Sequence, residues 1–290
     1  MLFRSGTIRV LRAEWELAEA AFHQALLIRE QVGDRRGLIE STVSVGQLEL
    51  LRGHWPAADA AHTRALHIAA SIDPGPMTVL AHRSMAVVSS LLGRTARAAA
   101  ELQSAYTLCQ SIPETLEYAP TLLALAELAL QQADLPVALT YANQALEAAR
   151  PVEHVLAAHV MLARIQTLAR AHRRARSHVA KALGAAETLA SPVWLSRAHL
   201  ALAGLATQTE AWQSAVTAYE KALRHADAAR APLEQALVRR TFADQLRARG
   251  VRPEMGERLR AEADQLLAGL VSRAAPGEAR PISAPTAASA

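Results

Sequence analysis

Histidine side chains are common metal ligands in proteins, and this chain carries eleven of them. His82, His159 and His199 each stand four residues before an alanine, within segments that resemble one another. Thr42 and Leu122 occupy the same position in two further copies. Equivalent positions on successive packed helices lie about 10 Å apart, whereas zinc ligands lie about 2.0–2.1 Å from the metal. We therefore expect no metal site and assign these histidines a packing role.

Recognisable catalytic chemistry is absent from the sequence. It contains no phosphate loop, dinucleotide-binding fingerprint, nucleophile elbow or metal-ligand spacing. The single cysteine, Cys109, excludes a disulfide or a cysteine-based metal site within the chain. Its place late in an expected helix favours a buried, unreactive thiol. We predict a non-catalytic protein without a cofactor.

Positive charge is concentrated in one block, since no acidic residue occurs between His154 and Ala186. One interpretation is a surface for an acidic partner or for phosphates; the other is a solvated convex corner. The net charge of +4 is modest for 290 residues, and no aromatic residue interrupts the block, so base stacking is not expected. We favour the solvated corner and expect no nucleic-acid partner. The cations are Arg164, Arg170, Arg173, Arg174, Arg176 and Lys181.

The elements that position these side chains follow from a repeated pattern of small residues. Two alanines seven residues apart, such as Ala58 and Ala65, occur in six copies, with the second alanine at 25, 65, 105, 145, 182 and 222. A third small residue precedes each first alanine by twelve positions, at 6, 46, 86, 126, 163 and 203. A fixed period of about 20–50 residues is typical of repeat architectures. Small residues let two helix backbones approach closely, which explains why these columns are kept small.

The composition favours helices throughout. Hydrophobic residues make up 51% of the chain but aromatic residues only 4%, and the apolar residues are mainly alanine and leucine, which form helices well. Each unit is predicted to contain a helix A, a short corner, a helix B and a longer connection. Glycines such as Gly53 and Gly93 suit the corners, and prolines such as Pro192 and Pro232 suit the first turn of helix A.

One copy in particular resembles the tetratricopeptide repeat, and the resemblance extends over roughly residues 1–250. The period is near 40 residues instead of about 34, and the aromatic residue usual late in helix A is missing. Lengthened repeats of this kind resemble the helical sensor regions of bacterial signalling ATPases and transcription activators, the MalT-like group. The residues that carry the resemblance are Val45-Gly46, Gly53-His54-Trp55, Ala58 and Ala65-Leu66.

The resemblance implies an all-α, right-handed α-α superhelix of about six helix pairs. Residues 1–270 form this domain in our prediction, with a polar capping helix from Met255 to Leu270. Residues 271–290, rich in proline, alanine and serine, are expected to be disordered. Only five residues precede Gly6, so the first helix A is expected to be short and uncapped, as in the C-terminal part of a longer protein.

Helix A lines the concave groove in tetratricopeptide-like proteins, and the resemblance implies the same here. The positions three before and one after the small residue are then expected to point inward. With Arg197 and Arg247 as outer additions, the predicted lining is Val43, Gln47, Arg83, Val87, Leu123, Glu127, Val160, Arg164, Arg197, Leu200, Arg240, Asp244 and Arg247.

These observations predict an interaction scaffold that binds a peptide or partner domain in its groove. The alternative is a sensor arm of a signalling ATPase or transcription activator, which would bind a small ligand or another domain. No signal-peptide core and no apolar run of about 18 residues is present, so we expect a cytoplasmic protein without a membrane partner. The sequence leaves the partner and the oligomeric state open.

Overall fold

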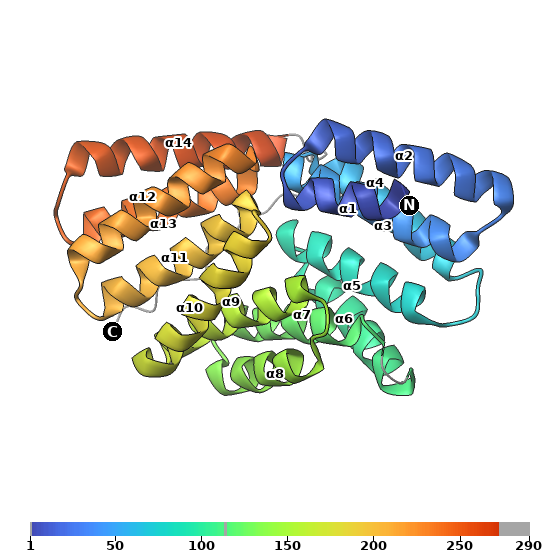
Figure 1. The fold of residues 1–290 in the computed structure, drawn as a ribbon, viewed down its shortest axis with the longest axis horizontal. Helices are drawn as coiled ribbons and strands as arrows, with labels where there is room; N and C mark the ends of the chain where they lie inside the picture. Colours follow the sequence, from blue (N-terminus) through green and yellow to red (C-terminus); the bar gives the residue numbers. More distant parts are fainter. Residues whose placement is uncertain (1, 113–114, 273–290) are drawn as a thin grey trace.

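The structure, a computed structural model, describes residues 2–112 and 115–272, and these residues fold into helices joined by short connections (Figure 1). The predicted disordered tail lies outside the described residues from position 273 onward, while positions 271 and 272 belong to the last helix. In chain order the helices are α1 (Leu2–Leu11), α2 (Trp15–Val32), α3 (Arg35–Arg52), α4 (Trp55–Ala69), α5 (Pro76–Leu91), α6 (Thr95–Ser111), α7 (Tyr118–Gln131), α8 (Leu135–Ala148), α9 (Val152–Leu168), α10 (His172–Thr188), α11 (Pro192–Gln208), α12 (Trp212–Ala229), α13 (Pro232–Ala248) and α14 (Pro253–Ser272).

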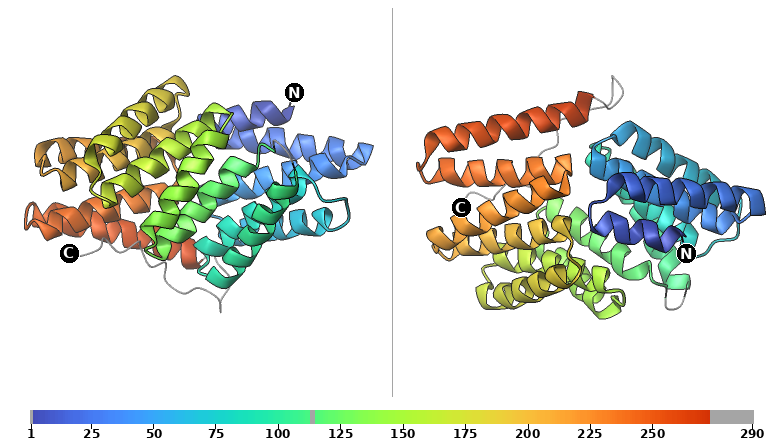
Figure 2. Two further views of the ribbon diagram at one scale, coloured as in Figure 1. Left: turned by 90° about the horizontal axis from the view of Figure 1, so that it is seen from below. Right: turned by 45° about the horizontal axis from the view of Figure 1, so that its top comes forward.

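The helices pack as successive antiparallel pairs, which confirms the predicted all-α solenoid (Figures 1 and 2). Odd-numbered helices are the A helices of the repeat and even-numbered helices are the B helices. The segment predicted as a capping helix, Met255 to Leu270, lies in α14, which packs against α13 and forms a seventh pair with it. None of the described helices combines the length and apolarity needed to cross a bilayer.

The corner between helices A and B has the same backbone conformation in every repeat. Seven residues after each small-column residue the chain turns left-handed, with φ between 57° and 80°. The next amide then donates to the carbonyl five residues earlier, as from His54 to Glu49 at 2.8 Å, which closes the helix end. Glycine occupies only three of these corners. The seven residues are Ala13, Gly53, Gly93, Ala133, Arg170, Glu210 and Gly250.

Replacing Glu210 by glycine is expected to stabilise the chain by about 0.5–1 kcal/mol. A side chain in the left-handed region costs roughly 1–2 kcal/mol, part of which the flexibility of unfolded glycine offsets. The measurement is urea-induced unfolding. Glu187→Gly, at an exposed position within α10, serves as the control and should destabilise by about 1 kcal/mol. If both variants lose stability alike, the corner is not strained.

The small columns form the packing seam between paired helices. From Ala58 to Ala222 the paired alanines are at most 1% exposed, as are Ala86 and Ala203 in the third column. At Gly6 and Gly46 the approach is closest, because a Cβ atom there would lie 2.5 Å from the Phe22 ring and 2.7 Å from the His62 ring, respectively. Larger residues would force the helices apart, at a cost of about 1–3 kcal/mol.

The superhelix closes on itself, which the repeat pattern did not predict. Each A helix from α3 to α13 contacts the next A helix, and α13 returns to contact α3. We call these six helices the inner ring. The two ends of the chain share apolar clusters: Trp15, Phe22 and Leu48 pack with Val193 and Ala231. A second shared cluster joins Leu50, Trp55, Met85 and Val88 to Leu267 and Leu270 of α14.

Candidate functional site

The inner ring presents one accessible position on each of its helices. Consecutive A helices contact one another directly, which places them on the inner side of the curve and the B helices outside. The residue just after the small column is exposed or half-buried in all six of them. These residues are Gln47, Val87, Glu127, Arg164, Gly204 and Asp244.

The position three residues before the small column is less uniform. Arg83, Leu123 and Leu200 are partly accessible. Val43 and Val160, by contrast, are only 1% and 7% exposed, because they fill the space between neighbouring helices. Their side chains belong to the core, so we remove both from the set of lining residues.

Charged residues of the inner ring pair across helix boundaries. Glu127 of α7 accepts a hydrogen bond from Arg164 of α9 at 2.8 Å. Arg197 of α11 donates through Nε to Glu234 of α13, also at 2.8 Å. The repeat pattern predicts both arginines and Glu127 as lining residues but not Glu234, since this acid stands in the first turn of α13, well before the small column.

A third pair joins Arg83 of α5 to Glu117 at the start of α7, with Nη2 and Oε2 2.8 Å apart. Both side chains are about 85% buried. Glu117 was also missed, because it lies in the connection before α7 and no periodic pattern marks it.

Glu127, Arg164 and Arg197 of the inner ring remain charged. Burial raises the pKa of Glu127, but the adjacent Arg164 outweighs this effect and leaves the pKa below its usual value. Glu127 raises the pKa of Arg164 in turn. Burial lowers the pKa of Arg197, and the neighbouring Glu234 reverses that, so that the net shift is upward. Because Glu127, Arg164 and Arg197 retain 36–38% exposure of their side chains, their charges are accessible to a ligand.

Arg240 of α13 differs from these arginines. It forms no ion pair with an acidic residue in the described ranges, and its buried Nε lacks a hydrogen-bond partner there. Asp244, one turn later, pairs with Arg260 of α14 instead. Arg247 is exposed. Arg240 and Arg247, which form no ion pair in the described ranges, are therefore the cations of α13 that can bind an anionic group from outside the chain.

The histidines of the shared repeat position each meet a partner on helix B of their own repeat. His82 contacts Glu101 at 2.7 Å between Nδ1 and Oε2. His159 and His178 bring their Nδ1 atoms to 2.9 Å. His199 stacks on His225 with ring centres 5.5 Å apart. Among the described residues no cluster of three or more potential metal ligands occurs.

Burial, and then the neighbouring histidine, lowers the pKa of His159 and of His199 to about 4. Lys181 near His159, and Lys221 and Arg224 near His199, contribute to the same downward shift of the pKa. Both rings are 7% exposed and are therefore neutral packing elements near pH 7.

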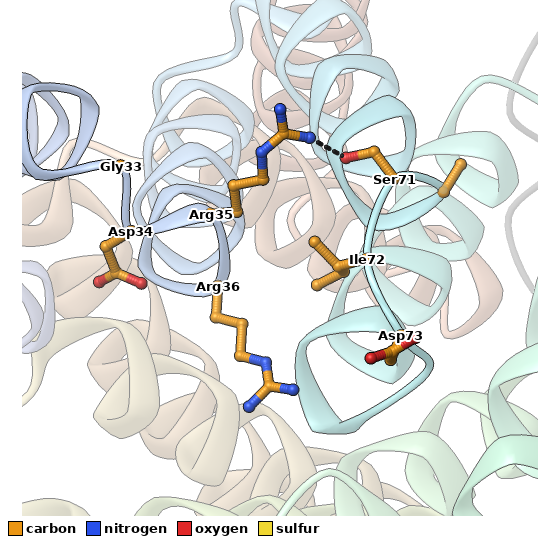
Figure 3. Close-up of a pocket in the computed structure, with 8 residues that line it drawn as sticks. Gly33, Asp34, Arg35, Arg36, Ser71, Ile72 and Asp73 are labelled. Carbon is orange, nitrogen blue, oxygen red and sulfur yellow. Dashed lines mark hydrogen bonds between the residues drawn. The ribbon is translucent and has the colours of Figure 1, made fainter.

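A pocket of about 610 Å³ lies away from the inner ring, between the α2–α3 corner and the α4–α5 connection (Figure 3). Arg35 donates to Ser71 across it at 2.7 Å. Asp34 caps α3 by accepting from the Gly37 amide. Arg35 and Ser71 thus join the two loops, and Asp34 closes the start of α3.

The basic residues predicted from sequence lie on an outer helix. Arg173, Arg174, Arg176 and Lys181 are exposed on α10, and Arg170 forms the left-handed corner before it. These residues are separate from the inner ring. Of the predicted basic block, only Arg164 lies on an inner helix, α9.

No protein-family model matches the chain, and no curated protein sequence does. Solved structures do match. A Rap protein complexed with Competence and Sporulation Factor has a TM-score of 0.73 at 14% identity, over 94% of this chain and 75% of that one. The Rap conjugation gene regulator of plasmid pLS20, in complex with the Phr* peptide, has a TM-score of 0.75 at 12% identity, over 93% and 74%.

Aspartyl phosphate phosphatase F from Bacillus subtilis is similar with a TM-score of 0.64 at 13% identity, over 91% of this chain and 69% of that one. Identities this low establish the architecture and leave the ligand to be argued from the residues present. By its architecture the chain is a tetratricopeptide-like helical-repeat solenoid.

Proposed function

We propose that the chain is a non-catalytic interaction scaffold that binds a peptide or an extended segment of a partner protein along the inner ring. The observation that carries this proposal is the accessible position that recurs on all six inner helices. Residues arranged in this way can contact successive side chains of one extended ligand. Two of the similar solved structures are named as complexes with a peptide or a factor, which supports a ligand of this kind.

The side chains of the inner ring indicate the chemistry of the ligand. Val87 is 38% exposed and, with Leu123 and Leu200, offers apolar contacts. Arg240 offers an unpaired cation for an acidic side chain. The charges of Glu127 and Arg164 neutralise each other, so this part of the ring repels neither sign. A peptide with apolar anchors and an acidic residue fits this surface.

Replacing Gly204 by tryptophan is expected to abolish peptide binding. A Cβ atom at Gly204 would have no neighbour within 4 Å, so the indole occupies open space on the inner ring without a clash at its base. The measurement starts with peptides selected from a random display library on the full chain. Their affinity should fall more than about tenfold, since a bulky group displaces several contacts.

Gly184→Trp provides the matched control. Gly184 is also helical with open space around its Cβ position, but it lies exposed on the outer helix α10. Selected peptides that bind Gly204→Trp as well as the parent chain would place their site elsewhere and contradict the proposal.

A second candidate function is a sensor arm of a bacterial signalling ATPase or transcription activator. The observation in its favour is the repeat period. Most successive left-handed corners, up to Gly250, lie 40 residues apart. Lengthened repeats of this kind are typical of the MalT-like group. A thermal-shift screen against small metabolites tests it. A compound that raises the melting temperature of both the parent chain and Gly204→Trp would favour this function over peptide binding.

A further inference from the structure

The outer face of α10 carries a row of cations that the fold leaves without partners. Arg173, Arg174, Arg176 and Lys181 are exposed, and none forms an ion pair with an acidic residue in the described ranges. They lack ion pairs within their own segment because the sequence contains no acidic residue between His154 and Ala186. The charges therefore face solvent unneutralised.

Elsewhere on the outside of the solenoid, arginines are paired between helices. Arg94 contacts Asp59 at 2.9 Å, and Arg64 contacts Glu30 on the neighbouring helix α2. On the inner helix α13, Arg239 pairs with Asp227 and Glu262 of the outer helices α12 and α14. What sets α10 apart from these repeats is that several unpaired cations share one helix in a segment without an acidic residue.

The cations of this face also act on the histidines beneath it. Burial is the main cause of the lowered pKa values of His159 and His178, and Lys181 lowers both further. On the next outer helix, α12, the exposed cations Lys221 and Arg224 act in the same direction on His225, again after burial. The potential therefore extends over two consecutive repeats.

We propose that this surface binds an acidic segment of a partner protein. We call it the basic face and define it as Arg170, Arg173, Arg174, Arg176 and Lys181, extended by Lys221 and Arg224. Arg173 and Lys181 are separated by roughly 12 Å along the helix, given a rise of about 1.5 Å per residue. That distance spans about four residues of an extended chain. The guanidinium group of arginine binds a carboxylate through two parallel hydrogen bonds. A segment with several successive Asp or Glu residues therefore matches both the chemistry and the spacing of these cations.

The chemistry of the basic face favours an acidic protein segment over a nucleic acid. Single-stranded nucleic acids are held by aromatic side chains on which bases stack, and Asn or Gln side chains read adenine while Arg and Lys read guanine. The α10 sequence, His172–Thr188, contains no Phe, Tyr, Trp, Asn or Gln. On α10 the basic face thus supplies charge and guanidinium geometry without a Phe, Tyr or Trp on which bases could stack. It lies on the outer helices and is a second site, separate from the inner ring.

The test uses the full chain and two anionic probes of equal length: a fluorescent octaglutamate peptide and a fluorescent eight-nucleotide oligothymidine. Binding is measured by fluorescence anisotropy at two salt concentrations. The triple variant Arg173→Glu, Arg174→Glu, Arg176→Glu should weaken peptide binding about tenfold or more, and binding should weaken with salt. The glutamine versions of the same three substitutions should give a smaller loss in the same direction, and circular dichroism checks that each variant is folded.

The control is Arg4→Glu, Arg12→Glu, Arg36→Glu, which makes the same change in net charge at three exposed arginines of the first repeats. An equal loss of octaglutamate affinity in this control would mean that the effect depends only on net charge, and it would overturn the proposal. The proposal would also be overturned, in favour of a nucleic acid, if the oligothymidine binds more tightly than octaglutamate and the triple variant weakens that binding. Gly204→Trp should leave octaglutamate binding unchanged. Weaker binding to this variant would mean that octaglutamate binds at the inner ring and not at the basic face.

Discussion

Replacing Leu267 and Leu270 by aspartate is expected to open the closed superhelix while leaving its helices intact. Leu270 is 1% exposed and packs with Leu50, Trp55 and Met85 of the first repeats. Burial of a leucine contributes about 1.5–3 kcal/mol, and a buried unpaired carboxylate adds a further cost. We therefore expect a loss of roughly 3–6 kcal/mol in the closing contact.

Gly53 shows how closely the two ends approach. A Cβ atom at Gly53 would lie 2.2 Å from Cδ2 of Leu270, and the backbone there has φ of +80°. Glycine thus serves both the corner and the contact with α14. An opened ring should have a larger radius of gyration in small-angle X-ray scattering and faster amide exchange at both ends, with unchanged helical circular dichroism.

The matched control for ring opening is Leu168→Asp. Leu168 is 44% exposed at the end of α9, so the same chemical change there should alter neither size nor exchange. If the double variant keeps the radius of gyration of the parent chain, the contact between the ends does not hold the ring closed.

Replacing His62 by leucine is expected to stabilise the chain and to remove part of its acid sensitivity. The His62 side chain is fully buried, and neither ring nitrogen has a hydrogen-bond partner among the described residues. Each unsatisfied buried polar group costs about 1–3 kcal/mol. Leu102 and Val179 occupy the equivalent position in other repeats, so an aliphatic side chain suits the site.

The pH dependence follows from the lowered pKa of His62. Burial, and then Arg83, lowers this pKa from 6.5 to about 4, while Asp59 opposes the shift. Protons therefore bind the unfolded chain more readily than the folded one between these values. Stability is complete above about pH 6.5 and falls by roughly 3 kcal/mol as the pH drops to 4. The leucine variant should lose this contribution and keep those of His159 and His199.

Urea unfolding between pH 4 and pH 7.5 measures the effect. His67→Leu is the control, because His67 is exposed on the same helix and should leave the pH profile unchanged. A parent-like profile in His62→Leu would mean that other groups cause the acid sensitivity.

The sequence by itself determined the repeating unit. Alanines at fixed spacing, corner glycines and opening prolines act within one helix pair, and such local signals can be read from a window of about 40 residues. They predicted the helix pairs and the accessible position on each inner helix. They also located the basic block, because it depends only on the absence of nearby acids in the sequence.

Only the tertiary structure decided how the repeats meet. The contact between Leu50 and Leu270, the pairing of Arg197 with Glu234 and the burial of Val43 all join residues from different repeats. Such contacts depend on the rotation accumulated over successive repeats, one of which is three residues shorter than its neighbours. Small rotations add along a solenoid, so closure of the ring is a property of the whole chain and is not encoded in any single unit.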